Sequence, residues 1–337
     1  MARTIRSSGR LLALASVAAA SGIWGMSGAV AQTTELSFYT TVPRNLSEPM
    51  GQRFTELNPT IKVNLFQAGV ETVLEKMELE IKGSGRSLAD VMWLEEPAAV
   101  KQFADQGRLE PYMPKDLDNV LAVYRDPQGR FVANHVAHVF IMYNTNTFPK
   151  DKAPKSWKDL GDRRFNKAIV LSNPAVSGTG ATIVSAMVQK YGWSYWEAIA
   201  KLKPVIVNGS QAQTSLIIQG ERPIGAIHDY TIADAIQRKQ PIGYTVPEEG
   251  GIALPAYVAI TKGTAKMDAA KKFYDFMISK DGADVLVKLG MYHTRTDLPG
   301  PSGRPPIADV KVMSFDWAEH SRDKAAMKAK FADIMEK

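Results

Sequence analysis

The chain has 337 residues, of which 45% are hydrophobic and 23% charged, and its formal net charge is +6. This length predicts about two domains with cores that need no crosslinks, and the ordinary apolar content excludes a chain that is disordered throughout. Cysteine is absent, which excludes disulfides, thiolate metal sites, cysteine nucleophiles and lipid anchors on cysteine.

The first 31 residues have the organisation of a secretory signal peptide. Three arginines within residues 1–10 precede an apolar run that begins at Leu11, and residues 29–31 (Ala-Val-Ala) fit the small-x-small cleavage pattern. The alternative is a membrane anchor, but glycines interrupt the run, which is shorter than the roughly 20 residues of a span. We expect cleavage after residue 31 and a mature chain free in a bacterial periplasm. Removal of the three arginines lowers the net charge from +6 to +3, which gives no indication of nucleic-acid binding.

Strands and helices alternate in the first half of the mature chain. Residues 61–66 alternate as a strand does, and residues 70–82 have apolar positions at helical spacing. Repeated strand–helix–strand order predicts parallel pairing with helices on both faces of the sheet. The elements predicted here are strands at 36–39, 61–66, 89–94 and 131–144, and helices at 45–57 (with Asn45 or Ser47 as N-cap), 70–82 and 97–103.

A polar segment rich in proline and lysine, residues 149–160, leads into a second block. Two α/β blocks joined by a long strand indicate two lobes. We assign residues 32–143 to the first lobe, 144–254 to the second, and 255–337 to a return to the first lobe followed by C-terminal helices. The elements predicted in this half are strands at 168–171, 205–207, 224–227 and 257–260, and helices between the second and third of these strands and at 181–191, 195–202, 267–280, 281–289 and 316–336.

The loop Ser177-Gly178-Thr179-Gly180 stands between a predicted strand and a predicted helix. Glycines let a backbone approach a ligand closely, and a helix N-terminus offers unpaired N–H groups with partial positive charge. The loop therefore indicates an anion site. The alternative is an ordinary turn in which Ser177 or Thr179 caps the helix. The loop lacks the Gly-Lys-Ser/Thr of a nucleotide-binding P-loop, and Ile183 stands where a dinucleotide fingerprint has its third glycine.

His228, Asp229 and Tyr230 directly follow an apolar strand. Ligands of open α/β sheets bind at the carboxyl ends of strands, so these side chains are placed for ligand contact. For Asp229 the alternative is that its carboxylate caps the next helix.

Acidic residues follow two further strands. Glu95 comes after the strand at 89–94, where it could equally be a first-turn acid that the helix dipole favours. Glu248 and Glu249 lie in a strand-end loop, for which the alternative is a solvated turn.

Catalytic patterns are scarce. His135 and His138 lie three apart in a predicted strand, so they face opposite sides and cannot share a metal there. There is no His-Glu-x-x-His and no Gly-x-Ser-x-Gly. Trp93 is most simply a core residue, although its place before Glu95 would also allow it to line a cleft.

Taken in order, these motifs resemble the family 1 extracellular solute-binding proteins of ABC importers, near the ferric-iron-binding and hexose-phosphate-binding subgroup. The resemblance implies an α/β fold of the two-lobed periplasmic type II class, with a mixed sheet flanked by helices in each lobe and the ligand in the interlobe cleft. It also implies delivery of the ligand to an inner-membrane ABC permease. We further expect a monomer without enzymatic activity, cofactor or metal ligands. The motifs are the signal peptide, 38–41 (FYTT), 89–95, 142–144 (MYN), 177–180 (SGTG), Asp-Tyr at 229–230, 247–251 (PEEGG) and 315–323 (FDWAEHSRD).

The ferric-binding pattern itself is incomplete. Glu95 and Tyr230 match it, but the position of the expected histidine falls at Pro43 or its neighbours, and the second tyrosine is replaced by Thr231. One carboxylate and one phenolate are too few hard donors for Fe³⁺. The anion loop is intact, and relatives that bind hexose phosphates have polar groups such as His-Asp in place of the tyrosines.

We therefore expect the ligand to be a small phosphorylated or otherwise anionic organic solute. Ferric iron is the second candidate, and a periplasmic hydrolase is the alternative from another class. The candidate ligand-binding residues are Thr40, Thr41, Glu95, Ser177, Gly178, Thr179, Gly180, His228, Asp229, Tyr230, Glu248 and Glu249.

Overall fold

The structure, a computed structural model, describes residues 33–336, so the predicted signal peptide lies outside the described residues. The eight predicted strands lie within a few residues of their expected positions, except that the strand expected at 257–260 begins at Ile252, because residues 252–256 also pair with the long strand 132–144. Three further strands, at 109–110, 242–245 and 292–293, are not among the predicted elements. The strands are β1 (Thr34–Thr40), β2 (Ile61–Gln67), β3 (Val91–Leu94), β4 (Leu109–Glu110), β5 (Val132–Asn144), β6 (Ile169–Ser172), β7 (Val205–Val207), β8 (Ile224–His228), β9 (Ile242–Thr245), β10 (Ile252–Thr261) and β11 (Tyr292–His293).

Several helices begin one to three residues from their predicted starts. The first helix follows Pro43 without a side-chain cap, so Asn45 and Ser47 are not N-caps; Ser47 lies inside the helix and donates to the Pro43 carbonyl over 3.2 Å. The helix expected at 181–191 begins at Gly178, because Ser177 caps it. The helices are α1 (Arg44–Leu57), α2 (Val70–Ser84), α3 (Pro97–Asp105), α4 (Gly178–Tyr191), α5 (Trp193–Ala200), α6 (Ser210–Gln219), α7 (Asp229–Gln237), α8 (Met267–Ile278), α9 (Lys280–Lys288) and α10 (Trp317–Met335).

The first lobe consists of a sheet with helices on both faces. Strands β1, β2 and β3 are parallel, as the strand–helix–strand order predicts, whereas β10 runs antiparallel to β3. Because side chains alternate along a strand, Phe38 and Trp93 pack on one face with α1 and α8, and Met92 and Leu94 pack on the other with α2 and α3.

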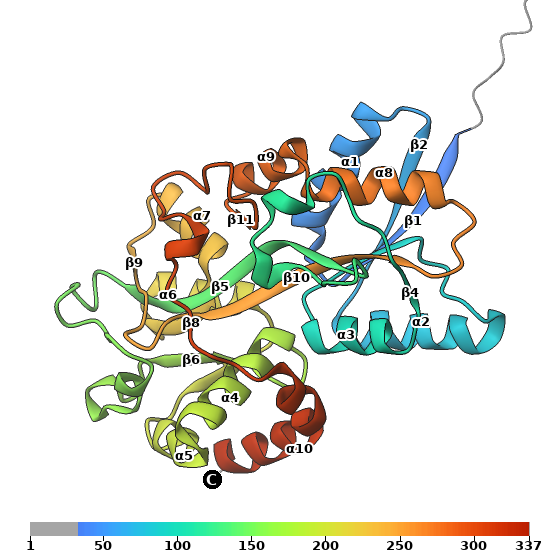
Figure 1. Cartoon of the computed structure of the whole chain (residues 1–337). Coiled ribbons are helices and arrows are strands. Elements are labelled where there is room, and N and C mark those ends of the chain that lie inside the picture. The colour runs from blue at the N-terminus through green and yellow to red at the C-terminus, as the bar shows by residue number, and fades with distance from the viewer. Residues whose placement is uncertain (1–32, 337) are drawn as a thin grey trace, which may run out of the picture. The chain divides into compact units, whose positions relative to one another are not determined.

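The second lobe repeats this arrangement. Strands β7, β6 and β8 are parallel neighbours, and β8 pairs antiparallel with β5. One face of this sheet packs on α4, α5 and α10, and the other packs on α6 and α7. Helix α10 lies beside α4 and α5 (Figure 1) and adds Met327, Phe331 and Ile334 to their core.

Strands β5 and β10 belong to both lobes. Val132 packs in the core of the first lobe, and Ala137, Val139 and Ile141 of the same strand pack in that of the second. Along β10, Leu254 lies in the core of the second lobe and residues 256–260 in those of the first. A single curled sheet, with strand order β2-β1-β3-β10-β5-β8-β6-β7, therefore runs through both lobes.

Candidate functional site

The Ser177–Gly180 loop forms the N-terminus of α4. The Ser177 hydroxyl accepts a hydrogen bond of 3.0 Å from the Gly180 N–H, which is the capping alternative considered for this residue. Gly180 packs so closely that a Cβ atom there would lie 2.8 Å from the Ser172 carbonyl oxygen. Within residues 33–336, the N–H groups of Gly178 and Thr179 have no hydrogen-bond partner. The start of this helix therefore offers two free N–H donors.

Thr179 and His228 come together from different strand ends. The Thr179 hydroxyl lies 3.0 Å from His228 Nε2. The His228 ring stacks on that of Tyr230, with ring centres 4.9 Å apart. Burial lowers the pKa of His228 and outweighs the neighbouring carboxylates, so the imidazole is neutral at neutral pH. Burial likewise raises the pKa of Tyr230, and the charges of Glu95 and Asp229 add to this increase.

Glu95 contacts His135, which is not among the predicted ligand-binding residues. His135 Nε2 lies 3.1 Å from Glu95 Oε1, the imidazole is completely buried, and the carboxylate is partly exposed. The Thr41 hydroxyl accepts from the Glu95 N–H over 2.9 Å and so fixes the backbone at this position. Thr40 is fully buried, and its hydroxyl donates to the Trp93 carbonyl over 2.7 Å. This hydroxyl therefore links the ends of β1 and β3.

Asp229 lies at the first position of α7, between His228 and Tyr230, but its side chain is directed into the protein. Its carboxylate accepts from Arg304 over 2.9 Å, from His138 Nδ1 over 3.3 Å and from the Tyr230 N–H over 2.9 Å. Burial alone would raise the pKa of Asp229, but the hydrogen bonds from His138 and the charge of Arg304 lower it. This carboxylate therefore holds α7 in place.

The two acidic residues of the strand-end loop differ in their surroundings. Glu248 is exposed. Glu249 accepts hydrogen bonds from the Trp157 N–H and the Tyr191 hydroxyl, which join the loop to the second lobe.

Sequence reasoning missed His135, His138 and Arg304 as partners of the candidate residues. His135 and His138 contact different carboxylates, Glu95 and Asp229. A sequence signal does exist for the histidines, because a polar ring inside an apolar strand needs a hydrogen-bond partner. Trp93 is completely buried, in agreement with its interpretation as a core residue.

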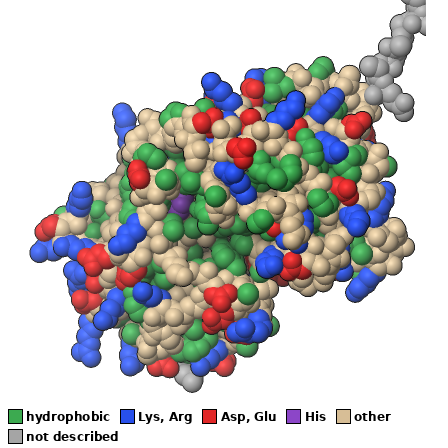
Figure 2. Space-filling view, in the orientation of Figure 1, with side chains coloured by type: hydrophobic (Ala, Val, Ile, Leu, Met, Phe, Trp, Pro, Cys, Tyr) green, Lys and Arg blue, Asp and Glu red, His purple; other side chains and the backbone are tan. Residues whose placement is uncertain are grey.

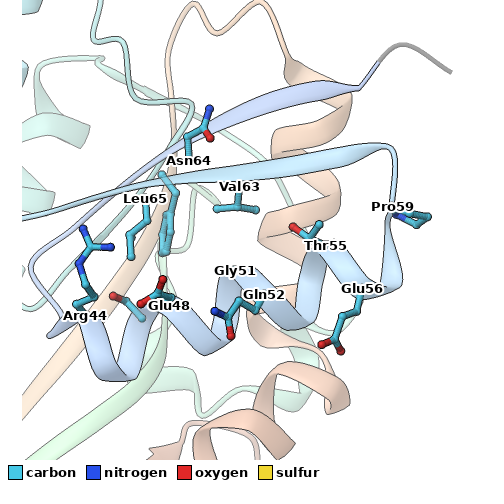
Figure 3. A pocket seen from close by; sticks show the side chains of 12 residues that line it. Arg44, Glu48, Gly51, Gln52, Thr55, Glu56, Pro59, Val63, Asn64 and Leu65 are labelled. Carbon is cyan, nitrogen blue, oxygen red and sulfur yellow. The ribbon is translucent and has the colours of Figure 1, made fainter. Parts of the chain in front are cut away.

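A groove of about 690 Å³ lies away from these residues, between α1 and β2 (Figure 3). Arg44, Glu48, Gln52 and Leu65 are among its lining residues, and none of the candidate residues is. On the face shown in Figure 2, basic and acidic side chains are interspersed and hydrophobic side chains line a hollow. Within the described residues, no three His, Asp or Glu side chains are grouped as a metal site, and no helix has the length and hydropathy to cross a membrane.

Candidate polar groups thus lie at the ends of β3 and β8, on the two sides of the shared strands β5 and β10. The model of the family "Bacterial extracellular solute-binding protein" matches residues 87–308, and the chain belongs to this family. An uncharacterised protein of Haemophilus influenzae is 29% identical over 314 residues, which cover 88% of each chain. A probable ABC transporter periplasmic-binding protein of Sinorhizobium fredii is 22% identical over 276 residues, or 76% of this chain and 74% of that protein.

Two solved structures have the same fold. Iron-bound HitA from Pseudomonas aeruginosa superposes with a TM-score of 0.78 at 19% identity, covering 88% of this chain and 99% of its own. AfuA from Actinobacillus pleuropneumoniae, with fructose-6-phosphate bound, gives a TM-score of 0.76 at 22% identity and covers 90% of this chain and 99% of its own. The predicted two-lobed α/β fold and the resemblance to periplasmic solute-binding proteins are confirmed.

Proposed function

We propose that this protein is the periplasmic substrate-binding component of an ABC importer and that it captures a small phosphorylated or otherwise anionic organic solute between its lobes. Family membership supports the binding role. The relative from Sinorhizobium fredii is named as an ABC transporter component, which supports an inner-membrane permease as partner. The predicted signal peptide supports the periplasmic location, and we further propose that the protein acts as a monomer.

The N-terminus of α4 is the observation that carries this proposal. It combines two free N–H groups, at Gly178 and Thr179, with the hydroxyl of Thr179. Its helix of 14 residues has its partial positive charge at this end. A phosphoryl group accepts hydrogen bonds from such donors without a metal ion.

The organic part of the solute would then lie toward the first lobe. Thr41, Glu95, His228 and Tyr230 can donate to or accept from hydroxyl groups, while Asp229 positions the last two. Hydrogen bonds to charged groups contribute about 1.5–3 kcal/mol each. Three or four of them, less the ordering cost, are compatible with micromolar binding, which corresponds to about 8 kcal/mol.

Ferric iron is the second candidate, because Tyr230 lies within the electrostatic influence of Glu95. Against it, Glu95 Oε1 is already in contact with His135, and the raised pKa of Tyr230 opposes formation of the phenolate that Fe³⁺ needs. Against the hydrolase alternative, the family to which the chain belongs is described as one of solute-binding proteins. Measured turnover of a phosphoester would favour the hydrolase.

Native mass spectrometry of the purified protein, followed by a thermal-shift screen, tests the proposal. The screen contains sugar phosphates, phosphonates, glycerol phosphates and ferric citrate. A phosphorylated compound should raise the melting temperature, whereas a shift with ferric citrate alone would contradict the proposal.

Calorimetry on variants then locates the site. Thr179→Asp places a carboxylate beside the expected phosphoryl group and should weaken binding at least about 100-fold, or about 2.8 kcal/mol. Thr179→Val removes the hydroxyl without adding charge and should cost less. Tyr230→Phe should also cost less, because it removes one hydroxyl. Normal binding by Thr179→Asp, together with lost binding by Tyr230→Phe, would favour iron.

A matched pair of caps provides the control. Ser177 caps α4 and Ser279 caps α9, each accepting from the N–H three residues later. Either serine changed to alanine should cost about 1 kcal/mol of stability. Only Ser177→Ala should also weaken binding of the solute, and equal binding by both variants would argue against the α4 site.

A further inference from the structure

Helix α10 has an apolar face and a charged face, and they contact different lobes. The apolar face packs in the core of the second lobe, where the rings of Phe331 and Trp196 lie 5.0 Å apart at 83°. The other face carries Lys324 and Lys328, which are charged, and His320, which is uncharged at neutral pH because its pKa is lowered to about 4. The three are spaced four residues apart and therefore lie on one side of the helix. We call these three residues the α10 stripe.

The α10 stripe faces two carboxylates of the first lobe. Lys324 Nζ lies 3.3 Å from Glu71 Oε1, in the first turn of α2, and 3.6 Å from Glu96 Oε2, at the N-cap of α3. Lys328 Nζ also lies 3.2 Å from Glu71 Oε1, and His320 Nε2 lies 4.0 Å from Glu96 Oε1. Figure 1 shows α10 between the second lobe and α3.

The two carboxylates differ in burial: the side chain of Glu71 is 57% exposed, as in a surface ion pair, whereas Glu96 is buried. The side chain of Glu96 is 6% exposed, and that of Lys324 is 17% exposed. Burial raises the pKa of Glu96 against the opposing charge of Lys324. Partial burial would raise the pKa of Glu71, but the charge of Lys324, a backbone hydrogen bond and the contact with Lys328 together lower it. In this arrangement the Lys324–Glu96 contact is screened by salt less than an exposed pair is, whereas the contacts of Glu71 are partly open to solvent.

The same contacts lie beside the candidate anion site. Lys328 Nζ reaches the Ala175 carbonyl over 3.5 Å, just before the Ser177–Gly180 loop. Gly178 lies so near α2 that a Cβ atom there would be 3.6 Å from the Val70 side chain. The start of α2 and the start of α4 therefore meet where the two lobes face each other.

We infer that the α10 stripe, with Glu71 and Glu96, is an electrostatic latch that holds the two lobes together in the absence of solute. This inference rests on the proposed function only in taking the space between the lobes as the binding cleft. Opening the cleft breaks the ion pairs of α10 with α2 and α3 while its apolar face stays in the second lobe. The latch thus shifts the open–closed equilibrium toward the closed state, which a solute can enter only after the latch opens.

Distance measurement between the lobes tests the latch without any ligand. The chain has no cysteine, so Lys82→Cys in α2 and Lys201→Cys at the end of α5, both exposed positions, can carry spin labels without background. Glu71→Lys places a third cation against Lys324 and Lys328. We expect it to increase the long-distance population at least about fivefold in solute-free protein.

The matched control is Arg322→Gln. Arg322 also lies on α10, but its partner is the neighbouring Asp323, so this variant should keep the distance distribution of the parent. An unchanged distribution for Glu71→Lys, or an equal change for Arg322→Gln, overturns the latch.

A second perturbation covers the case in which Glu71→Lys does not fold. Glu71→Gln, and the parent protein in 0.5 M sodium chloride, should both shift the distribution toward longer distances, because salt screens the exposed part of the latch. No shift in either sample overturns the inference. These measurements use no ligand, so their result does not depend on the screen of phosphorylated compounds. If that screen fails, the distance measurements still decide whether the latch exists.

Discussion

Replacing Asp229 by asparagine should destabilise the protein strongly although the change is nearly isosteric. The carboxylate is 3% exposed and has four donors: Arg304, two groups of His138 and the Tyr230 N–H. An amide keeps one oxygen and replaces the other with a donor. Either Arg304 or a backbone N–H then faces an NH₂ group, and the charge of Arg304 loses its partner.

The expected cost follows from the burial of this pair. Removing one partner of a buried ion pair costs about 3–5 kcal/mol. Unfolding a chain of about 300 residues has an entropy near 0.6 kcal/mol/K at about 2.1 cal/mol/K per residue, so the melting temperature should fall by about 5–8 °C. Differential scanning calorimetry at pH 7 measures this shift.

The control for this variant lies on the same helix. Asp234 pairs with Arg238 on the surface of α7, with more than half of each side chain exposed, so Asp234→Asn should lower the melting temperature by less than about 1 °C. Equal shifts for Asp229→Asn and Asp234→Asn would refute the reasoning.

The pH dependence provides a second check. The folded pKa of Asp229 lies below its unfolded value, so the carboxylate stabilises the fold above the unfolded pKa, about 3.9. This contribution is lost as the pH falls through the folded pKa. The difference in stability between the parent and Asp229→Asn should therefore persist down to about pH 4 and shrink only below it.

Three further outcomes are expected. Burial and the charges of Lys324 and Lys328 lower the pKa of His320 to about 4, so below the ordinary pKa of about 6.5 the unfolded state binds more protons than the folded state. Acidification from about pH 6.5 to about pH 4 should therefore remove at most about 3 kcal/mol of stability. In urea titrations, His320→Gln should lack this part of the loss, and the same pH dependence of stability in parent and variant would contradict it. Gly180→Ala should destabilise the protein, because its Cβ would lie 2.8 Å from a backbone carbonyl oxygen. Gly178→Ala should be neutral or stabilising, because its Cβ would lie at an ordinary 3.6 Å from a side chain. A lower melting temperature for Gly178→Ala than for Gly180→Ala would be evidence against the packing described. N-terminal sequencing of periplasmic material should begin at Gln32, and retention of residues 1–31 would show that the predicted cleavage is wrong.

Local patterns were sufficient to predict much of the fold. The alternation at 61–66 and the helical spacing at 70–82 each correspond to an element of the structure, β2 and α2, because both patterns report which side of an element is buried. The sequence could not show that residues 252–256 extend β10, since their pairing depends on β5, more than a hundred residues earlier.

The candidate site, too, could be predicted from the sequence only in part. Thr179 and His228 each follow a strand, and strand ends of one parallel sheet meet at one edge, so their contact could be anticipated. The partners of Glu95 and Asp229 could not, because His135 and His138 lie on a strand shared by both lobes and Arg304 lies in a distant loop. These contacts depend on how segments distant in the sequence pack together, which local sequence patterns do not show.

The place of α10 in the second lobe has a consequence for the order in which the chain folds. Because Met327, Phe331 and Ile334 complete the core around α4 and α5, that lobe lacks part of its apolar interior until a segment translated long after β6 has emerged. The first lobe likewise waits for β10 and α8. The second lobe cannot reach its final packing until the end of the chain is made, and the first lobe cannot do so until Met291 is made. Nascent chains therefore stay open to chaperones over most of their synthesis, and loss of α10 would leave the exposed surface of α4 and α5 prone to aggregation.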